Sequence, residues 1–128
     1  NNQFVVNMVS ESFAEKMVIC STDFESNVDE FEISGLNPIA SDRINPPRLL
    51  ESKVSFECEL NQIVEIGNSD AGSGFIVIGT VLLFHIDDEV YENGRILIDK
   101  LEPIGRLAGN KYTRPSDVFE ISRKIKPE

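Results

Sequence analysis

The stretch VSFECELNQIVEIGNSDAGSGFIVIGTVLLFHI, residues 54–86, decides the fold of this 128-residue chain. In residues 54–66 apolar and polar side chains alternate, with Gln62 and Ile63 as the only exceptions, which is the pattern of a β-strand with one apolar face. Residues 75–86 are apolar on both sides and rich in β-branched residues, as in a strand covered on both faces. Residues 67–74 are turn formers, so the sequence predicts two long strands that are antiparallel neighbours.

Shorter elements are predicted before this pair of strands. Residues 4–6 form a short buried strand, and Ser12 with Glu15 makes a Ser-x-x-Glu capping box that opens a helix. Residues 28–33 are typical of a second short helix, closed by Gly35. The N-terminal part therefore supplies a strand and two small helices.

After the long strands, residues 90–99 predict a compact hairpin that turns at Asn93-Gly94 and returns through residues 95–98. Residues 117–125 are typical of either a late strand or a loose arm. A mostly β fold, an antiparallel barrel with a few peripheral helices, fits this order better than a βαβ series.

The amino-acid composition limits the classes of partner that this chain can bind. The chain has 22 acidic and 12 basic residues, a formal charge of -10, which repels nucleic acid and anionic lipid. The apolar run at residues 75–84 is far shorter than the roughly 20 residues that span a bilayer. Cys20 and Cys58 are expected to be buried free thiols rather than a disulfide framework. We expect a soluble cytoplasmic protein with no nucleic-acid or membrane partner.

The stretch PIGRLAGNKYTR, residues 103–114, is the best candidate for a ligand site. Gly105 and Gly109 flank Arg106; they are either plain turn residues or the means by which backbone N–H groups approach a ligand. Arg106 could contact a phosphate or pair with an acidic side chain. Tyr112 could stack on a flat ligand or lie half-buried at a subunit contact. Such a loop suits a flat, anionic ligand.

Three stretches carry a family resemblance by their order and spacing: NPPRLLESKVSFECEL (residues 45–60), GFIVIGTVLLFHIDD (74–88) and PIGRLAGNKYTR (103–114). Together they resemble the flavin reductase-like FMN-binding family, and more narrowly its branch with flavoredoxins and the reductase component of nitrilotriacetate monooxygenase. The resemblance implies a split antiparallel β-barrel, and a homodimer with FMN at the interface. It also implies that a preceding region supplies the first strands and many phosphate contacts. Residues 1–128 are then the C-terminal portion of a single domain, incomplete at its N-terminus.

The resemblance assigns Arg106, Gly105, Gly109 and Tyr112 to FMN binding, and no catalytic residue stands out. Asn7 could hydrogen-bond a flavin edge or merely satisfy local backbone groups. His85, the only histidine, is expected to be a hydrogen-bonded structural imidazole, with acid or base catalysis near the flavin as the alternative. No cluster with metal-ligand spacing accompanies it, so no metal site is expected.

The resemblance implies an oxidoreductase that passes electrons from NAD(P)H or a protein donor to flavin or another acceptor, with a monooxygenase or electron-transfer protein as a possible partner. Short-chain flavin reductases have Gly-Asp-His just before the position of Phe75, where this chain has Gly72-Ser73-Gly74. This difference in sequence argues against direct use of NAD(P)H and favours a protein similar to the flavoredoxins. The alternative function is a non-catalytic split-barrel module that binds a ligand or protein, its flavin site having decayed.

Overall fold

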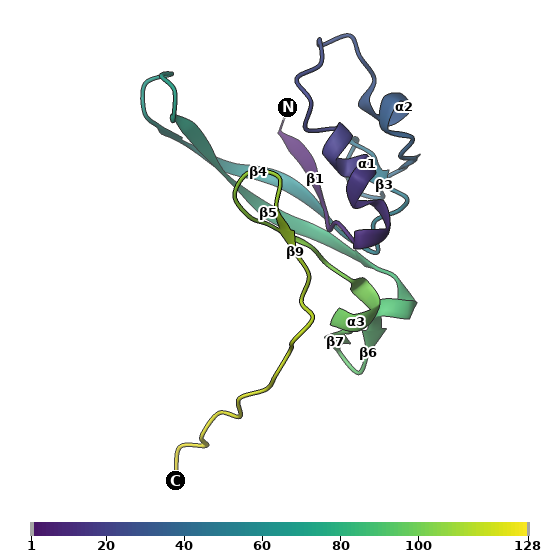
Figure 1. The fold of residues 1–128 in the computed structure, drawn as a ribbon, viewed down its shortest axis with the longest axis vertical. Coiled ribbons are helices and arrows are strands. Elements are labelled where there is room, and N and C mark those ends of the chain that lie inside the picture. Colours follow the sequence, from purple (N-terminus) through teal and green to yellow (C-terminus); the bar gives the residue numbers. More distant parts are fainter. Residues whose placement is uncertain (1, 128) are drawn as a thin grey trace.

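The centre of the molecule is a three-stranded antiparallel sheet in the order β1-β4-β5 (Figure 1). A computed structural model describes residues 2–127. Strands β4 (Val54–Ile66) and β5 (Gly74–Ile86) form a long hairpin, paired from Val54 opposite Ile86 to Ile66 opposite Gly74, with two register shifts. The prediction of two long antiparallel neighbours is therefore confirmed.

The remaining elements are short and lie around this sheet. They are β1 (Gln3–Asn7), η1 (Glu11–Phe13), α1 (Ala14–Ile19), α2 (Glu30–Ser34), β2 (Pro38–Ile39), β3 (Arg48–Leu49), η2 (Asp88–Val90), β6 (Tyr91–Glu92), β7 (Arg95–Ile96), α3 (Ile98–Leu101), β8 (Gly105–Arg106) and β9 (Tyr112–Thr113). Strands β2 and β3, β6 and β7, and β8 and β9 pair as separate two-stranded sheets. The fold is mostly β with peripheral helices, as predicted, and the sheets of residues 2–127 do not close into a complete barrel.

The hydrophobic core lies where the base of the long hairpin meets the following segments. Its buried centre is Val54, Val90 and Leu101, with Phe56 and Ile96 packed against it. On the sheet Phe56 also meets Phe84 edge to face, with ring centroids 5.0 Å apart. Residues from β4, η2 and α3 thus hold the C-terminal segments against the sheet.

The two cysteines differ in burial. Both thiols are free; Cys58 is buried and Cys20 only half-buried, so the prediction of buried free thiols holds in full only for Cys58. Among residues 2–127, no helix has the length and apolar character needed to cross a membrane.

The start of the first helical segment differs from the predicted capping box. Ser10, not Ser12, stands before the first turn, and α1 begins at Ala14 with no side-chain cap. Ser10 is 1% exposed and its hydroxyl donates to the Leu101 carbonyl, 2.6 Å away, so a long-range contact fixes this helix start. The capping-box prediction was wrong because Ser12 lies inside the 3-10 turn.

The neighbouring elements follow the sequence more closely. Gly35 ends α2 in the left-handed conformation with φ 73°, as predicted, although the helix begins at Glu30. The predicted strand at residues 4–6 is present in β1 but is half-buried, with Val6 39% exposed. In this part of the chain the predicted helix end at Gly35 is therefore correct, whereas the predicted burial of residues 4–6 is only partly correct.

The C-terminal part shows one confirmed turn and one shortened strand. Asn93 (φ 51°) and Gly94 (φ 76°) form the predicted hairpin turn between β6 and β7. The returning strand was predicted to reach residue 98, but α3 begins at Ile98. Residues 117–125 have no regular structure and are exposed, which agrees with the loose arm rather than the late strand (Figure 1).

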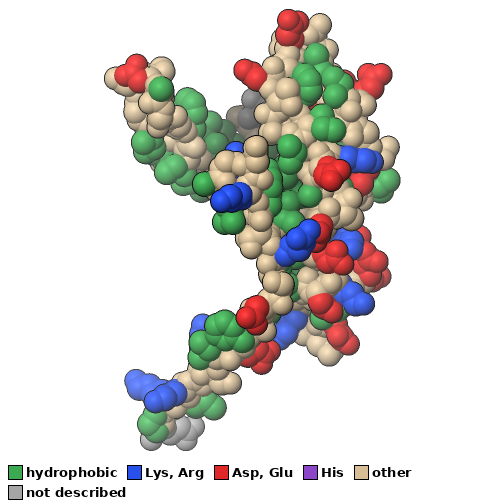
Figure 2. Space-filling view, viewed as in Figure 1, with side chains coloured by type: hydrophobic (Ala, Val, Ile, Leu, Met, Phe, Trp, Pro, Cys, Tyr) green, Lys and Arg blue, Asp and Glu red, His purple; other side chains and the backbone are tan. Residues whose placement is uncertain are grey.

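The prediction that β5 is covered on both faces is wrong for the described residues. Phe75 is 68% exposed and Val77 is 54% exposed. The physical reason is that the far part of the β4-β5 hairpin projects beyond the other described elements, so none of residues 2–127 forms a layer over either of its faces (Figure 1). The far part of the long hairpin therefore projects with its apolar side chains uncovered (Figure 2).

Candidate functional site

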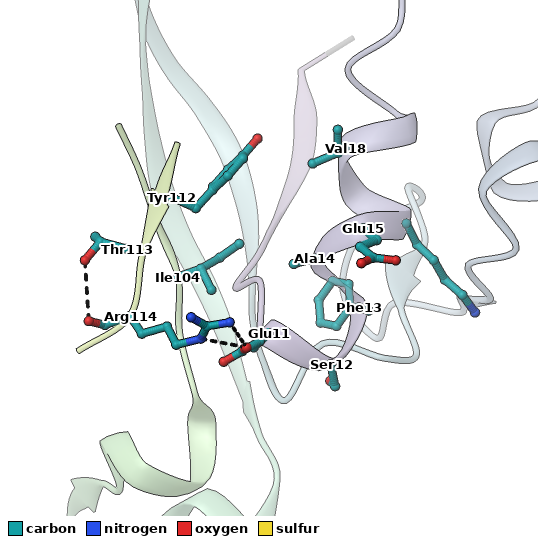
Figure 3. A pocket seen from close by; sticks show the side chains of 11 residues that line it. Glu11, Ser12, Phe13, Ala14, Glu15, Val18, Ile104, Tyr112, Thr113 and Arg114 are labelled. Carbon is teal, nitrogen blue, oxygen red and sulfur yellow. Dashed lines mark hydrogen bonds and ion pairs between the residues drawn. The ribbon is translucent and has the colours of Figure 1, made fainter. Parts of the chain in front are cut away.

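A groove of about 610 Å³ lies between the first helical segment and strand β9 (Figure 3). Its volume is within the range of about 300–1,000 Å³ that is typical of small-molecule sites. The lining residues are Glu11, Ser12, Phe13, Ala14, Glu15, Lys16, Val18, Ile104, Tyr112, Thr113 and Arg114. The groove thus joins two segments about one hundred residues apart in the sequence.

The groove has apolar walls and an aromatic side chain. Phe13, Ala14 and Val18 face it from the helical side, and Ile104 and Tyr112 face it from the opposite side (Figure 3). The phenol of Tyr112 is partly exposed, so its ring offers a flat face beside open space. This arrangement can accept a planar, largely apolar ring.

An ion pair at the edge of the groove provides a positive charge. Arg114 Nε donates to Glu11 Oε1 at 2.7 Å, and Arg114 Nη2 lies 2.5 Å from the same oxygen. The hydrogen bond from Arg114 lowers the pKa of Glu11. The Arg114 side chain is 70% exposed and a guanidinium has five N–H donors, so an anion can also approach it. Arg114 can therefore bind an anionic group while it remains paired with Glu11.

Arg114 was not predicted as an individual site residue. It follows Tyr112 by two positions, and in an extended chain such residues point to the same side, which was the available signal. Its contact with Glu11, 103 positions away, carries no local signal. Phe13 and Lys16 were missed as lining residues for the same reason.

The glycine-flanked arginine loop forms the hairpin β8-β9 beside the groove. Gly105 pairs with Thr113 and Arg106 with Tyr112, and Gly109 lies in the turn with φ 64°. Arg106 is exposed, does not line the groove and makes no side-chain hydrogen bond or ion pair among the described residues. The hairpin therefore positions Tyr112 at the groove, and the binding roles of the other three residues stay predictions.

Asn7 lies away from the groove and its side chain already has partners. Its Oδ1 accepts from the Leu49 backbone N–H at 3.1 Å and from the Ser55 hydroxyl at 3.0 Å. These contacts match the local role that the sequence left open for Asn7. The structure thus brings only Tyr112 of the predicted binding residues to the groove.

A second polar cluster lies in the sheet, around the fully buried carboxylate of Glu57. It accepts from the backbone N–H groups of Asp42 at 2.9 Å and Arg43 at 2.7 Å, and it contacts Nε2 of His85 on β5. Burial alone would raise the pKa of Glu57. The hydrogen bonds from Asp42, His85 and Arg43 outweigh burial and lower this pKa from 4.5 to about 2.

Asp42, Glu57 and His85 bring one ligand atom each to within 4.8 Å of one another, which is compatible with a metal ion. Both oxygens of Glu57 already have N–H donors, however. The arrangement favours a structural role for Glu57, whose hydrogen bonds hold the loop at residues 42–43 against the sheet. The hydrogen-bonded histidine expected from the sequence is confirmed, and no sequence signal had indicated that Glu57 is buried.

The chain is similar to known proteins over most of its length. The family described as "Flavin reductase like domain" matches residues 1–103. The chain belongs to this flavin reductase-like family. A relative from Aquifex aeolicus is 41% identical over 113 residues, covering 88% of this chain and 55% of the relative. Another, YwrF of Bacillus subtilis, is 34% identical over 127 residues, covering 96% of this chain and 62% of YwrF.

Solved structures of other proteins have a similar fold. Nitrilotriacetate monooxygenase component B from Bacillus cereus is similar at a TM-score of 0.87 and 32% identity, covering 94% of this chain and 60% of that one. A Shewanella frigidimarina protein with a split barrel domain has a TM-score of 0.81 at 21% identity, covering 97% and 62%. The split-barrel fold class is therefore confirmed. The chain spans between one half and two thirds of the length of these proteins.

Proposed function

We propose that this protein is an FMN-binding, flavin reductase-like oxidoreductase that passes electrons from NAD(P)H or a protein donor to flavin or another acceptor. The observation that carries the proposal is the family match over residues 1–103, together with a groove that presents an aromatic ring and a cation. The 32% identity to nitrilotriacetate monooxygenase component B supports the same class of reaction.

The groove residues fit part of a flavin. The apolar side chains of Phe13 and Ile104 can contact a ring system, and Tyr112 can stack on it or border it. Arg114 and the exposed Arg106 can attract a phosphate or the electron-rich end of the ring. Gly105 and Gly109 allow the β8-β9 hairpin to place Arg106 and Tyr112 on adjacent strands.

When bound, a flavin supplies the redox chemistry, so the chain itself needs no catalytic acid-base pair. The tasks of its residues are to hold the ring, orient it and limit the access of water. We further propose a homodimer with FMN at the interface, a cytoplasmic location, and a monooxygenase or another electron-transfer protein as partner. The exposed apolar surface of the long hairpin supports the homodimer, and the monooxygenase component among the similar structures supports the electron-transfer partner.

An absorption spectrum of the full-length protein as purified tests cofactor binding. The expected result is a yellow protein with flavin absorption bands, and a higher melting temperature when FMN is added. A colourless protein that gains no heat stability from FMN would contradict the proposal. Anaerobic mixing with NADH and with NADPH then tests turnover, because an enzyme that uses these donors bleaches its flavin band.

The second candidate function is a non-catalytic module that binds a ligand or a protein partner. The Gly72-Ser73-Gly74 sequence, which ends the turn of the long hairpin and begins β5, is the observation that favours it. Binding of FMN without bleaching by NADH, NADPH or reduced electron-transfer proteins would support this second candidate.

Two substitutions in the β8-β9 hairpin test the predicted role of Arg106 beside the groove. We expect Arg106→Ala to weaken FMN binding about tenfold or more, because a charge-assisted hydrogen bond is lost, without changing the melting temperature of the flavin-free protein. Lys111→Ala is the matched control, since Lys111 is an exposed basic residue in the same hairpin. Equal FMN dissociation constants for the two variants would remove Arg106 from the site.

A further inference from the structure

The ion pair of Glu11 and Arg114 lies at the boundary between two cavities. Both residues line the groove of about 610 Å³, and both also line a smaller neighbouring cavity of about 190 Å³. The smaller cavity has two further acidic residues in its lining, Asp99 and Glu102, and no basic residue besides Arg114. Like charges repel, so these carboxylates disfavour an anion in the smaller cavity. An anion is therefore expected to approach Arg114 from the groove.

The guanidinium of Arg114 has one edge that Glu11 leaves accessible. Its Nε and Nη2 both contact Glu11 Oε1, at 2.7 Å and 2.5 Å, and Figure 3 marks these two contacts with dashed lines. Its Nη1 has no hydrogen bond or ion pair among residues 2–127. A guanidinium can bind a phosphate through two parallel N–H donors, and the edge between Nη1 and Nη2 still offers such a pair. Glu11 thus occupies one edge of Arg114 and leaves the other for a ligand.

Glu11 is the more firmly held member of this pair. Its backbone N–H donates to the Glu102 carbonyl at 2.9 Å, and the preceding Ser10 is 1% exposed and donates to the Leu101 carbonyl at 2.6 Å. The Arg114 side chain, by contrast, is 70% exposed. A long exposed side chain loses rotamer entropy when it binds a ligand, and a partner that holds it beforehand reduces this loss. Glu11 is well placed to hold Arg114 in this way.

The other basic residue that lines the groove is directed elsewhere. Lys16 Nζ lies 3.5 Å from the Gly35 carbonyl at the end of α2. Arg114 is therefore the basic lining residue with a free donor edge beside the groove. We propose that Glu11 is a positioning residue, which holds Arg114 so that its free edge binds the phosphate of a flavin mononucleotide. The inference rests on the proposed function and adds the residue that orients the phosphate contact.

Flavin fluorescence titrations of the full-length, flavin-free protein with FMN and with riboflavin test the phosphate contact. Riboflavin lacks the phosphate, so the ratio of the two dissociation constants reports on this group alone. Arg114→Gln should raise the FMN dissociation constant about tenfold or more, because a charge-assisted hydrogen bond is lost. The same variant should change the riboflavin constant less than about twofold.

Glu11→Ala tests the positioning role. It should raise the FMN dissociation constant about threefold to tenfold, because Arg114 then loses its rotamer freedom only when FMN binds. Glu15→Ala is the matched control, since Glu15 is another exposed acidic residue that lines the groove and makes no contact with Arg114. Both variants remove one negative charge, which by itself favours an anion, so Glu15→Ala should bind FMN as tightly as the wild type or more tightly. The melting temperature of the flavin-free Glu11→Ala protein should stay close to that of the wild type, because exposed ion pairs contribute little to stability.

A double-mutant cycle shows whether Glu11 acts through Arg114. In the Arg114→Gln background, Glu11→Ala should not raise the FMN dissociation constant any further, because the side chain that it positions is gone. Riboflavin binding should be the same in all four proteins of the cycle. A purely structural effect of Glu11 would instead weaken FMN and riboflavin alike and persist without Arg114.

The outcomes separate this inference from the proposed function. FMN binding by Glu11→Ala as tight as that of the wild type, or tighter, would overturn the positioning role. Additive effects of the two substitutions would overturn it as well. Equal FMN constants for the wild type and Arg114→Gln would overturn the phosphate contact while flavin binding stands. A protein that binds neither FMN nor riboflavin would overturn both the inference and the proposed function.

Discussion

Replacement of Glu57 by Gln should destabilise the protein strongly and should remove part of its acid sensitivity. The Glu57 carboxylate is 0% exposed and accepts hydrogen bonds from the backbone N–H groups of Asp42 and Arg43 while it contacts His85. A glutamine of the same shape would direct an NH₂ group at one of these donors. A buried donor would then be left without an acceptor.

The size of the effect follows from the pKa of Glu57, which the fold lowers from 4.5 to about 2. Since each pKa unit corresponds to about 1.4 kcal/mol, the native contacts of the ionised group contribute about 3 kcal/mol. The sign follows from proton linkage: the folded protein binds this proton more weakly than the unfolded chain. The contribution is therefore complete above about pH 5 and is lost as the pH falls through 4.5 towards 2.

The assay is urea unfolding of the wild type and the variant at a series of pH values between 7 and 2.5. At pH 7 the free energy of unfolding of Glu57→Gln should be lower by about 3 kcal/mol, and the difference should shrink as Glu57 of the wild type becomes protonated. Glu59→Gln is the matched control, because Glu59 is exposed on the same strand, and it should change stability by less than about 0.5 kcal/mol. Equal stabilities of the two variants at pH 7, or a difference that does not change with pH, would refute the reasoning.

Two further predictions concern packing and the helix start. Gly79→Ala should lower stability by about 1–3 kcal/mol, since its Cβ would meet the ring of Phe4, whereas Gly74→Ala on the same strand meets open space and serves as the control. Ser10→Ala should cost about 1–2 kcal/mol, because it removes the buried hydrogen bond to the Leu101 carbonyl. Thermal unfolding measures all three variants, and a Gly74→Ala variant as unstable as Gly79→Ala would contradict the packing argument.

The sequence alone determined the elements that depend on neighbouring residues. The alternation in residues 54–66 and the apolar run that follows it predicted the long hairpin, because a strand's two faces differ at every second position. Gly35 and Asn93-Gly94 marked turns that need positive φ, and the structure has φ 73°, 51° and 76° there. The family resemblance, which rests on the order of motifs, was also readable from the chain.

Only the tertiary structure decided which residues meet across long separations. The burial of Glu57 depends on a loop 15 residues earlier and a strand 28 residues later, and its polar side chain gave no local sign of it. The helix start depends on Ser10 bonding to a carbonyl 91 positions away, so the local pattern selected Ser12 instead. The groove likewise lies between segments that only the fold brings together: the Glu11 backbone N–H donates to the Glu102 carbonyl, and the Glu11 side chain contacts Arg114, 103 positions away. Periodicity reports which way a side chain points along its own strand or helix, whereas the partner that it meets is set by how those elements pack together.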